Sequence, residues 1–141
     1  MIYEFCAENV TLLEKAMEDG ARRIELCDNL AVGGTTPSYG VTKAAVELAA
    51  NYDTTIMTMI RPRGGDFVYN DLEIAIMLED IRLTAQSGSQ GVVFGALTAD
   101  KKLDKANLEK LIAASKGMEI VFHMAFDELS EEDQLEAIDW L

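Results

Sequence analysis

The sequence predicts an α/β protein built from parallel βα units. Five times along the chain, a short apolar or β-branched run is followed by a polar loop and then by a segment of helical period, which is the alternation of a parallel sheet covered by helices. The 141 residues are 49% hydrophobic, which is enough to bury a core. No linker or low-complexity tract divides them, so we expect a single domain over residues 1–141.

Five runs are expected to form the strands. They lie at about residues 2–7, 23–27, 54–61, 91–97 and 119–126. The first two runs echo each other as EFC and ELC, which predicts parallel neighbours with Glu4 beside Glu25 and Cys6 beside Cys27. Because side chains alternate along a strand, these four residues would share one face, and the apolar residues between them would face the helices.

The segments between the strands carry helix signals. The clearest apolar stripe follows the i, i+3, i+4, i+7 spacing and consists of Ile74, Met77, Leu78, Ile81 and Ala85. Side chains that can cap a helix start stand at Asn70, Asp104 and Ser130. Glycines that can end a helix in the left-handed conformation stand at Gly20, Gly88 and Gly117.

Two architectures fit five βα units. Five units can form a doubly wound open sheet, whereas a closed barrel needs eight units and about 200 residues or more. The chain stops at Trp140 and Leu141, within the expected fifth helix. The residue pattern therefore leaves open either an open sheet or the front part of a barrel.

The charge and hydropathy patterns argue against several partners. Twenty-five acids against twelve bases give a net charge of −13, which disfavours binding to nucleic acid or to anionic membrane surfaces. The apolar runs are too short to span a membrane, and the N-terminus lacks the basic region of a signal peptide. Cys6 and Cys27 are therefore expected as reduced thiols in a cytoplasmic protein.

Two arginines stand at the carboxyl end of the third expected strand, in the sequence MIRPRGGDF. Proline keeps Arg61 extended, so Arg61 and Arg63 would share the face of the preceding alternate residues. Ligands bind at this end of parallel strands. Together with Asp66, the arginines could form a clamp for a small anion, or they could instead pair with Asp66 and the inward acids as a structural network.

The single histidine suggests proton transfer. By strand alternation, the side chains of His123 and Asp127 would both point toward the mouth of the fold, the opening at the carboxyl ends of the strands. There a carboxylate could fix the imidazole tautomer. Glu25 is a third candidate acid or base. The alternative is a core histidine bonded to a backbone carbonyl, and no zinc-type spacing of histidine and cysteine exists.

The two cysteines suggest a metal site. Thiolates are soft ligands that favour Cu(I) or zinc, so Cys6 and Cys27 on neighbouring strands could share one ion. The alternative is that both are buried thiols that behave as small hydrophobes.

Four blocks of sequence, in this order and at these spacings, resemble the CutC family of copper-homeostasis proteins. They are RIELC at 23–27, GGTTPS at 33–38, RPRGGDF at 61–67 and FHMAFD at 122–127. The resemblance spans the whole chain and implies a cytoplasmic TIM-type (βα)₈ barrel with a role in copper handling.

The sequence departs from the family pattern in two ways. Family members are substantially longer, so the resemblance implies that five of eight βα units are present and that the last three are missing. The fifth-strand motif FHRAFD has Met124 in place of its arginine. Because an incomplete barrel leaves strand edges open, we expect a homo-oligomer or a longer natural chain.

Three functional hypotheses follow. The first is a metal-handling protein with Cu(I) on Cys6 and Cys27, which the family resemblance favours. The second is a barrel enzyme that binds a small anionic substrate at Arg61 and Arg63 while Glu25, His123 or Asp127 moves a proton, which the charged mouth favours. The third is a scaffold protein without a ligand.

Overall fold

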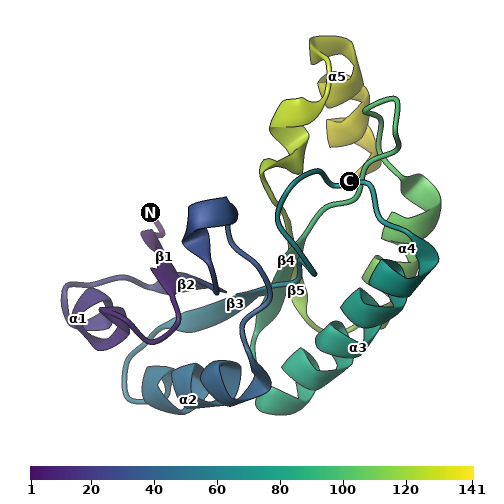
Figure 1. Ribbon diagram of the computed structural model, residues 1–141. Coiled ribbons are helices and arrows are strands. Elements are labelled where there is room, and N and C mark those ends of the chain that lie inside the picture. Colours follow the sequence, from purple (N-terminus) through teal and green to yellow (C-terminus); the bar gives the residue numbers. More distant parts are fainter.

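The computed structural model describes all 141 residues as a five-stranded parallel sheet flanked by helices (Figure 1). The strands are β1 (Glu4–Glu8), β2 (Arg23–Cys27), β3 (Thr55–Met59), β4 (Gly91–Phe94) and β5 (Glu119–Phe122). They lie side by side in chain order, β1-β2-β3-β4-β5. This sequential order is that of a βα barrel, because a doubly wound sheet reverses direction at a switch point. The incomplete barrel is therefore the architecture that the structure supports.

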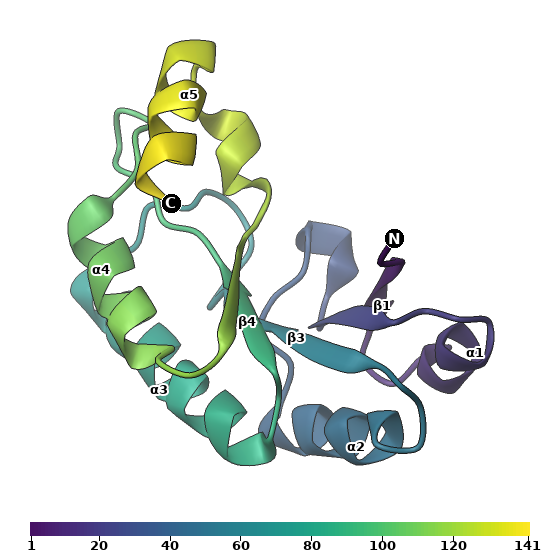
Figure 2. The ribbon, with the colours of Figure 1, turned by 180° about the vertical axis from the view of Figure 1, so that it is seen from behind.

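Five α-helices and two short 3₁₀ helices connect or follow the strands. They are α1 (Leu13–Glu18), η1 (Leu30–Val32), α2 (Tyr39–Ala49), α3 (Asp71–Ser87), α4 (Lys105–Ala114), η2 (Met124–Glu128) and α5 (Glu131–Trp140). Helices α2, α3 and α4 follow the outer side of the curved sheet, and α5 stands beyond the carboxyl end of β5 (Figures 1 and 2). None of these helices is long and apolar enough to cross a membrane.

The expected helix caps are confirmed. The side chains of Asn70, Asp104 and Ser130 each accept a hydrogen bond from a backbone N–H in the first turn of their helix. The three expected stop glycines, Gly20, Gly88 and Gly117, all have positive φ. In the α3 stripe, Ile74, Met77 and Ile81 are buried as expected. Ala85 is exposed instead, and Thr84 takes its place against the core.

The outer face of the sheet carries most of the apolar core. Ile24, Leu26 and Ile56 pack against α1 and α2, while Val92 and Phe94 pack against α3 and α4. The inner face carries a smaller cluster, formed by Cys27, Met57, Met59 and Val93. The strands thus separate an apolar face that holds the helices from a mixed face that is free to carry functional groups.

The predicted register of β1 and β2 is wrong by two residues. Glu4 pairs with Arg23, and Cys6 pairs with Glu25, rather than Glu4 with Glu25 and Cys6 with Cys27. An ion pair between the Arg23 guanidinium and the Glu4 carboxylate accounts for the shift, because like charges directly opposite each other are unfavourable. A shift of two residues keeps every side chain on its predicted face.

Three expected strands end earlier than predicted, by two to four residues. Ile60, Ala96, Leu97 and Ala125 lie beyond the last paired residues of β3, β4 and β5, yet all are buried. These positions look like strand in the sequence because they are apolar. In the structure they pack as buried loop or as the 3₁₀ helix η2.

We predict that replacing Ile24 with alanine lowers the free energy of unfolding by about 2–5 kcal/mol, because it leaves a cavity under α1 and α2. The matched control is Ile120→Ala on the edge strand β5, where the side chain is 40% exposed and the loss should be about 1 kcal/mol or less. Urea denaturation of both variants measures the difference. Equal losses would contradict the placement of Ile24 in a closed core beneath α1 and α2.

Candidate functional site

Three potential metal ligands meet on the inner face of β1 and β2. Cys6 Sγ lies 3.7 Å from Glu25 Oε1 and 4.0 Å from Cys27 Sγ, and Cys27 Sγ lies 3.8 Å from the same carboxylate oxygen. The three ligand atoms lie within 4.8 Å of one another. Cys27 is fully buried, Glu25 is half-buried and Cys6 is exposed. The site is therefore open on the side of Cys6.

The surroundings keep both thiols protonated at neutral pH. Burial, together with the nearby charges of Cys6 and Glu25, raises the pKa of the Cys27 thiol. Burial and the Glu25 carboxylate raise the pKa of Cys6 in the same way. Burial and the neighbouring Glu4 raise the pKa of Glu25. In the absence of a metal, the two thiols thus hold protons that a cation would displace.

The register of β1 and β2 favours a shared ligand over a disulfide. Cys6 and Cys27 are diagonal neighbours on one sheet face, so the strand spacing and rise place their Cα atoms about 8 Å apart. Cysteines more than about 7 Å apart cannot form a disulfide without backbone movement. A metal ion bonded to both sulfurs at about 2.3 Å, the length of a zinc–thiolate bond, could bridge up to about 4.6 Å. The observed separation of 4.0 Å falls within that reach.

A glycine closes the site on the side of the β2–α2 loop. A Cβ atom at Gly34 would lie 3.0 Å from Cys27 Sγ, and Gly34 has a φ of +86°. Both the close approach and the left-handed backbone favour glycine here. Gly34 thereby buries the Cys27 thiol against the loop.

The open side of the site is a concavity of ≈ 620 Å³ on the inner face of the sheet. Its lining includes Cys6, Glu25, Met59, His123 and Asp127. The structure therefore brings the predicted catalytic residues and one predicted metal ligand to a single hollow. None of the three predicted anion-binding residues, Arg61, Arg63 and Asp66, lines this concavity.

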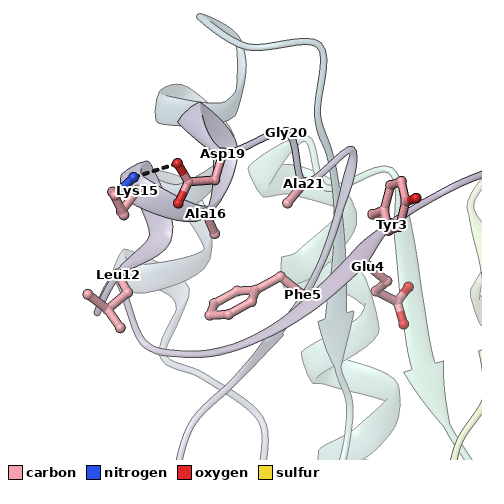
Figure 3. Close-up of a pocket in the computed structure, with 9 residues that line it drawn as sticks. All are labelled: Tyr3, Glu4, Phe5, Leu12, Lys15, Ala16, Asp19, Gly20 and Ala21. Atoms are coloured by element: carbon pink, nitrogen blue, oxygen red, sulfur yellow. Dashed lines mark hydrogen bonds and ion pairs between the residues drawn. The ribbon is translucent and has the colours of Figure 1, made fainter.

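A second hollow, of ≈ 480 Å³, lies between β1 and α1 (Figure 3). Phe5, Leu12 and Ala16 contribute apolar surface there, and the ion pair of Lys15 with Asp19 lies at its side. No histidine or cysteine lines it. It offers shape and apolar surface but no converging chemical groups.

Arg61 binds backbone carbonyls at the carboxyl end of the sheet. Its side chain is only 2% exposed. Nη1 donates to the carbonyls of Val32 (2.7 Å) and Gly34 (3.0 Å), and Nη2 donates to the carbonyl of Gly65 (2.7 Å). The guanidinium also stacks on the ring of Phe67, 4.8 Å from its centroid. Arg61 thus ties the loop after β2 to the loop after β3.

Arg63 has a different set of partners. Its Nε donates to Glu73 (2.5 Å), and its Nη2 donates to Asp66 (3.1 Å) and to the carbonyl of Val68 (2.8 Å). The hydrogen bond from Arg63 lowers the pKa of Glu73. Of the two interpretations of RPRGGDF, these contacts favour pairing over an anion clamp at Arg63 and Asp66. Glu73 was not predicted, because it comes from the first turn of α3 rather than from the motif.

His123 is a buried, neutral imidazole. Its Nδ1 accepts a hydrogen bond from the N–H of Ala125 (3.2 Å), and its ring lies 4.9 Å from that of Phe67. Burial, together with the charge of Arg61, lowers the pKa of His123 to about 4. The predicted pairing with Asp127 is wrong. The chain turns into η2 after β5, which leaves Asp127 exposed and without a hydrogen bond to the imidazole.

We predict that replacing Arg61 with lysine lowers the free energy of unfolding by about 2–4 kcal/mol, because a lysine cannot reach three carbonyls in the fixed geometry of the guanidinium. The control is Arg82→Lys, which changes an exposed pair with Glu79 and should have little effect. Chemical denaturation compares the two variants. An equally small effect at Arg61 would mean that its hydrogen bonds do not hold the loops.

Known proteins match this chain over its full length. The family model described as the CutC family matches residues 1–141. The chain is 54% identical to a CutC family protein of Enterococcus faecalis and 53% identical to one of Streptococcus pyogenes. In each case the matched region covers 100% of this chain and 68% of the relative. A crystal structure of CutC from Streptococcus agalactiae is 49% identical and superimposes with a TM-score of 0.95, over 99% of this chain and 66% of that one.

These matches agree with the resemblance found in the four sequence blocks. The chain spans about two thirds of the length of these relatives. Its five βα units superimpose on the corresponding part of the Streptococcus agalactiae structure. The chain belongs to the CutC family.

Proposed function

We propose that this protein binds Cu(I) through the thiolates of Cys6 and Cys27, with the carboxylate of Glu25 beside them, and that it serves in copper homeostasis. The observation that carries the proposal is the approach of the three ligand atoms to within 4.8 Å of one another. Membership of the CutC family supports a copper-homeostasis type of protein, and copper homeostasis is part of the name of the Streptococcus agalactiae relative.

The donor set favours Cu(I) over the other common cations. Two thiolates are soft ligands, which suit Cu(I) and zinc and do not suit calcium or magnesium. Structural zinc sites use four protein ligands, whereas three converge here. His123, the single histidine, accepts a backbone hydrogen bond at Nδ1 and does not belong to the group. Reduced thiols of this kind also favour a cytoplasmic location.

A second candidate function is proton transfer on a small anionic substrate. Glu25, His123 and Asp127 line the same concavity, and the raised pKa of Glu25 brings this carboxyl group nearer the range of a general acid or base at neutral pH. Against it, Arg63 already has two carboxylate partners, and the Nη atoms of Arg61 are bonded to carbonyls. Copper binding is therefore the better supported of the two.

We predict that the wild-type protein binds one Cu(I) in an anaerobic titration against a competing chelator. The Cys6→Ser/Cys27→Ser variant should bind Cu(I) more than about 100-fold more weakly. Loss of a residue that only supports a metal ligand can already lower the affinity by up to that factor, and this variant loses both thiolates. The matched control is Met124→Leu, which removes another sulfur from the lining of the same concavity and should leave binding unchanged. Binding that does not depend on the two cysteines would contradict the proposal.

The pH dependence of the same titration gives a separate prediction. Because the pKa of both thiols is raised, protons compete with copper throughout the neutral range. The apparent affinity should therefore rise with pH, by up to about tenfold per pH unit for each thiol proton displaced. An apparent affinity for Cu(I) that stays constant from about pH 6 to about pH 8 would mean that no thiol proton is released on binding.

The free sheet edges support a homo-oligomer. β1 and β5 each have one unpaired edge, and the apolar side chains of Ile2, Leu135 and Ile138 are exposed. Because open edges promote association, we predict that this 141-residue chain sediments as a dimer or larger species. Sedimentation velocity measures this, and a monodisperse monomer that unfolds cooperatively would contradict it.

A further inference from the structure

Cys27 is the least accessible ligand of the candidate copper site. The residue is 0% exposed, and it does not line the concavity that Cys6 and Glu25 line. Residues 29–34, which we call the cover loop, close over it, because a Cβ atom at Gly34 would lie only 3.0 Å from Cys27 Sγ. A metal ion or a reagent that arrives from solvent can therefore bind this sulfur only after part of its surroundings has moved.

The cover loop has the properties of a segment that opens locally. Asp28 and Thr35 exchange two backbone hydrogen bonds, of 2.9 and 2.7 Å, at its base, so the loop leaves and rejoins the chain at one place. Two of its large apolar side chains, Leu30 and Val32, are 37% and 42% exposed. Its first residue, Asn29, has a φ of +48°, which is uncommon for a residue other than glycine. Segments with few buried apolar contacts open at low cost in free energy.

Charged side chains hold the cover loop closed from two sides. On the side of β3, Arg61 Nη1 donates to the carbonyls of Val32 (2.7 Å) and Gly34 (3.0 Å). On the side of β1, the carboxylate of Glu8 accepts a hydrogen bond from the N–H of Leu30 (2.6 Å). Hydrogen bonds to ionised groups are stronger than those between neutral groups. Loss of the Arg61 guanidinium would therefore release the loop without breaking the backbone pairing of β2.

We propose that the cover loop is a gate on Cys27 and that Arg61 is the positioning residue that holds this gate closed. Opening of residues 29–34 about the pair of Asp28 and Thr35 exposes the Cys27 sulfur, and Cu(I) reaches and leaves this sulfur through the open gate. The part of the proposal that concerns copper rests on the proposed function. The gate itself is defined by the accessibility of the thiol and does not depend on copper.

The first test is the rate at which iodoacetamide alkylates Cys27 in a Cys6→Ser parent protein, at fixed pH. Adding Arg61→Lys should raise this rate by about tenfold or more, the equivalent of one lost hydrogen bond to a charged group. Adding Gly34→Ala should raise it too, because the new methyl group meets the sulfur and disfavours the φ of +86°. The matched control is Gly88→Ala, which strains a φ of +87° at the end of α3 and should leave the rate unchanged.

The dependence of the alkylation rate on urea separates opening of the gate from unfolding of the whole protein. Local opening exposes little surface, so the rate should hardly change at low urea concentration, whereas global unfolding gives a rate that rises steeply with urea. This comparison holds even if the variants are less stable than the parent protein. The gate is ruled out if Arg61→Lys and Gly34→Ala react no faster than Gly88→Ala, or if the rate in the parent protein rises steeply from the lowest urea concentrations.

The second test measures copper exchange with both cysteines present. A competing chelator should remove Cu(I) about tenfold faster from Gly34→Ala than from Gly88→Ala, because strain in the left-handed region favours the open loop. Equal rates of removal would overturn the role of the gate in copper exchange. If the wild type does not bind Cu(I) through its cysteines, the proposed function fails, and the alkylation rates still decide whether the gate exists.

Discussion

The guanidinium of Arg61 holds together the end of the sheet at which the candidate copper site lies. It binds the carbonyl of Gly34, and Gly34 in turn closes over the sulfur of Cys27. That contact helps to bury the thiol, and burial is the main cause of its raised pKa. A charge at the end of β3 therefore sets the environment of a thiol on β2. A ligand can reach the site from the side of Cys6 and Glu25, which line the concavity.

The faces of the sheet could be predicted from the sequence, but the register could not. Alternation of side chains placed Glu4, Cys6, Glu25 and Cys27 on one face, and the structure agrees. The echo of EFC and ELC suggested the wrong lateral partners, because any shift by an even number of residues gives the same alternation. The ion pair between Glu4 and Arg23 selects among these registers. The selected register makes the cysteines diagonal neighbours, which suits a shared ion better than a disulfide.

The strand ends and the roles of the two arginines were harder to predict, for a related reason. Loop residues past β3, β4 and β5 are as apolar as strand residues because they too are buried, so hydrophobicity does not mark where pairing stops. Arg61 and Arg63 share a motif, yet the turn after Pro62 separates their surroundings. Arg63 meets Glu73 from α3, whereas the guanidinium of Arg61 binds three carbonyls and stacks on the ring of Phe67. Such differences depend on partners distant in sequence.

The central claim is that one Cu(I) bridges the sulfurs of Cys6 and Cys27. X-ray absorption at the copper edge of the anaerobically loaded protein tests it most directly, because the fine structure distinguishes sulfur from oxygen or nitrogen neighbours. The account predicts two sulfur neighbours in the wild type and one in Cys6→Ser. A first shell of oxygen and nitrogen alone, or a sulfur count that Cys6→Ser leaves unchanged, would contradict it.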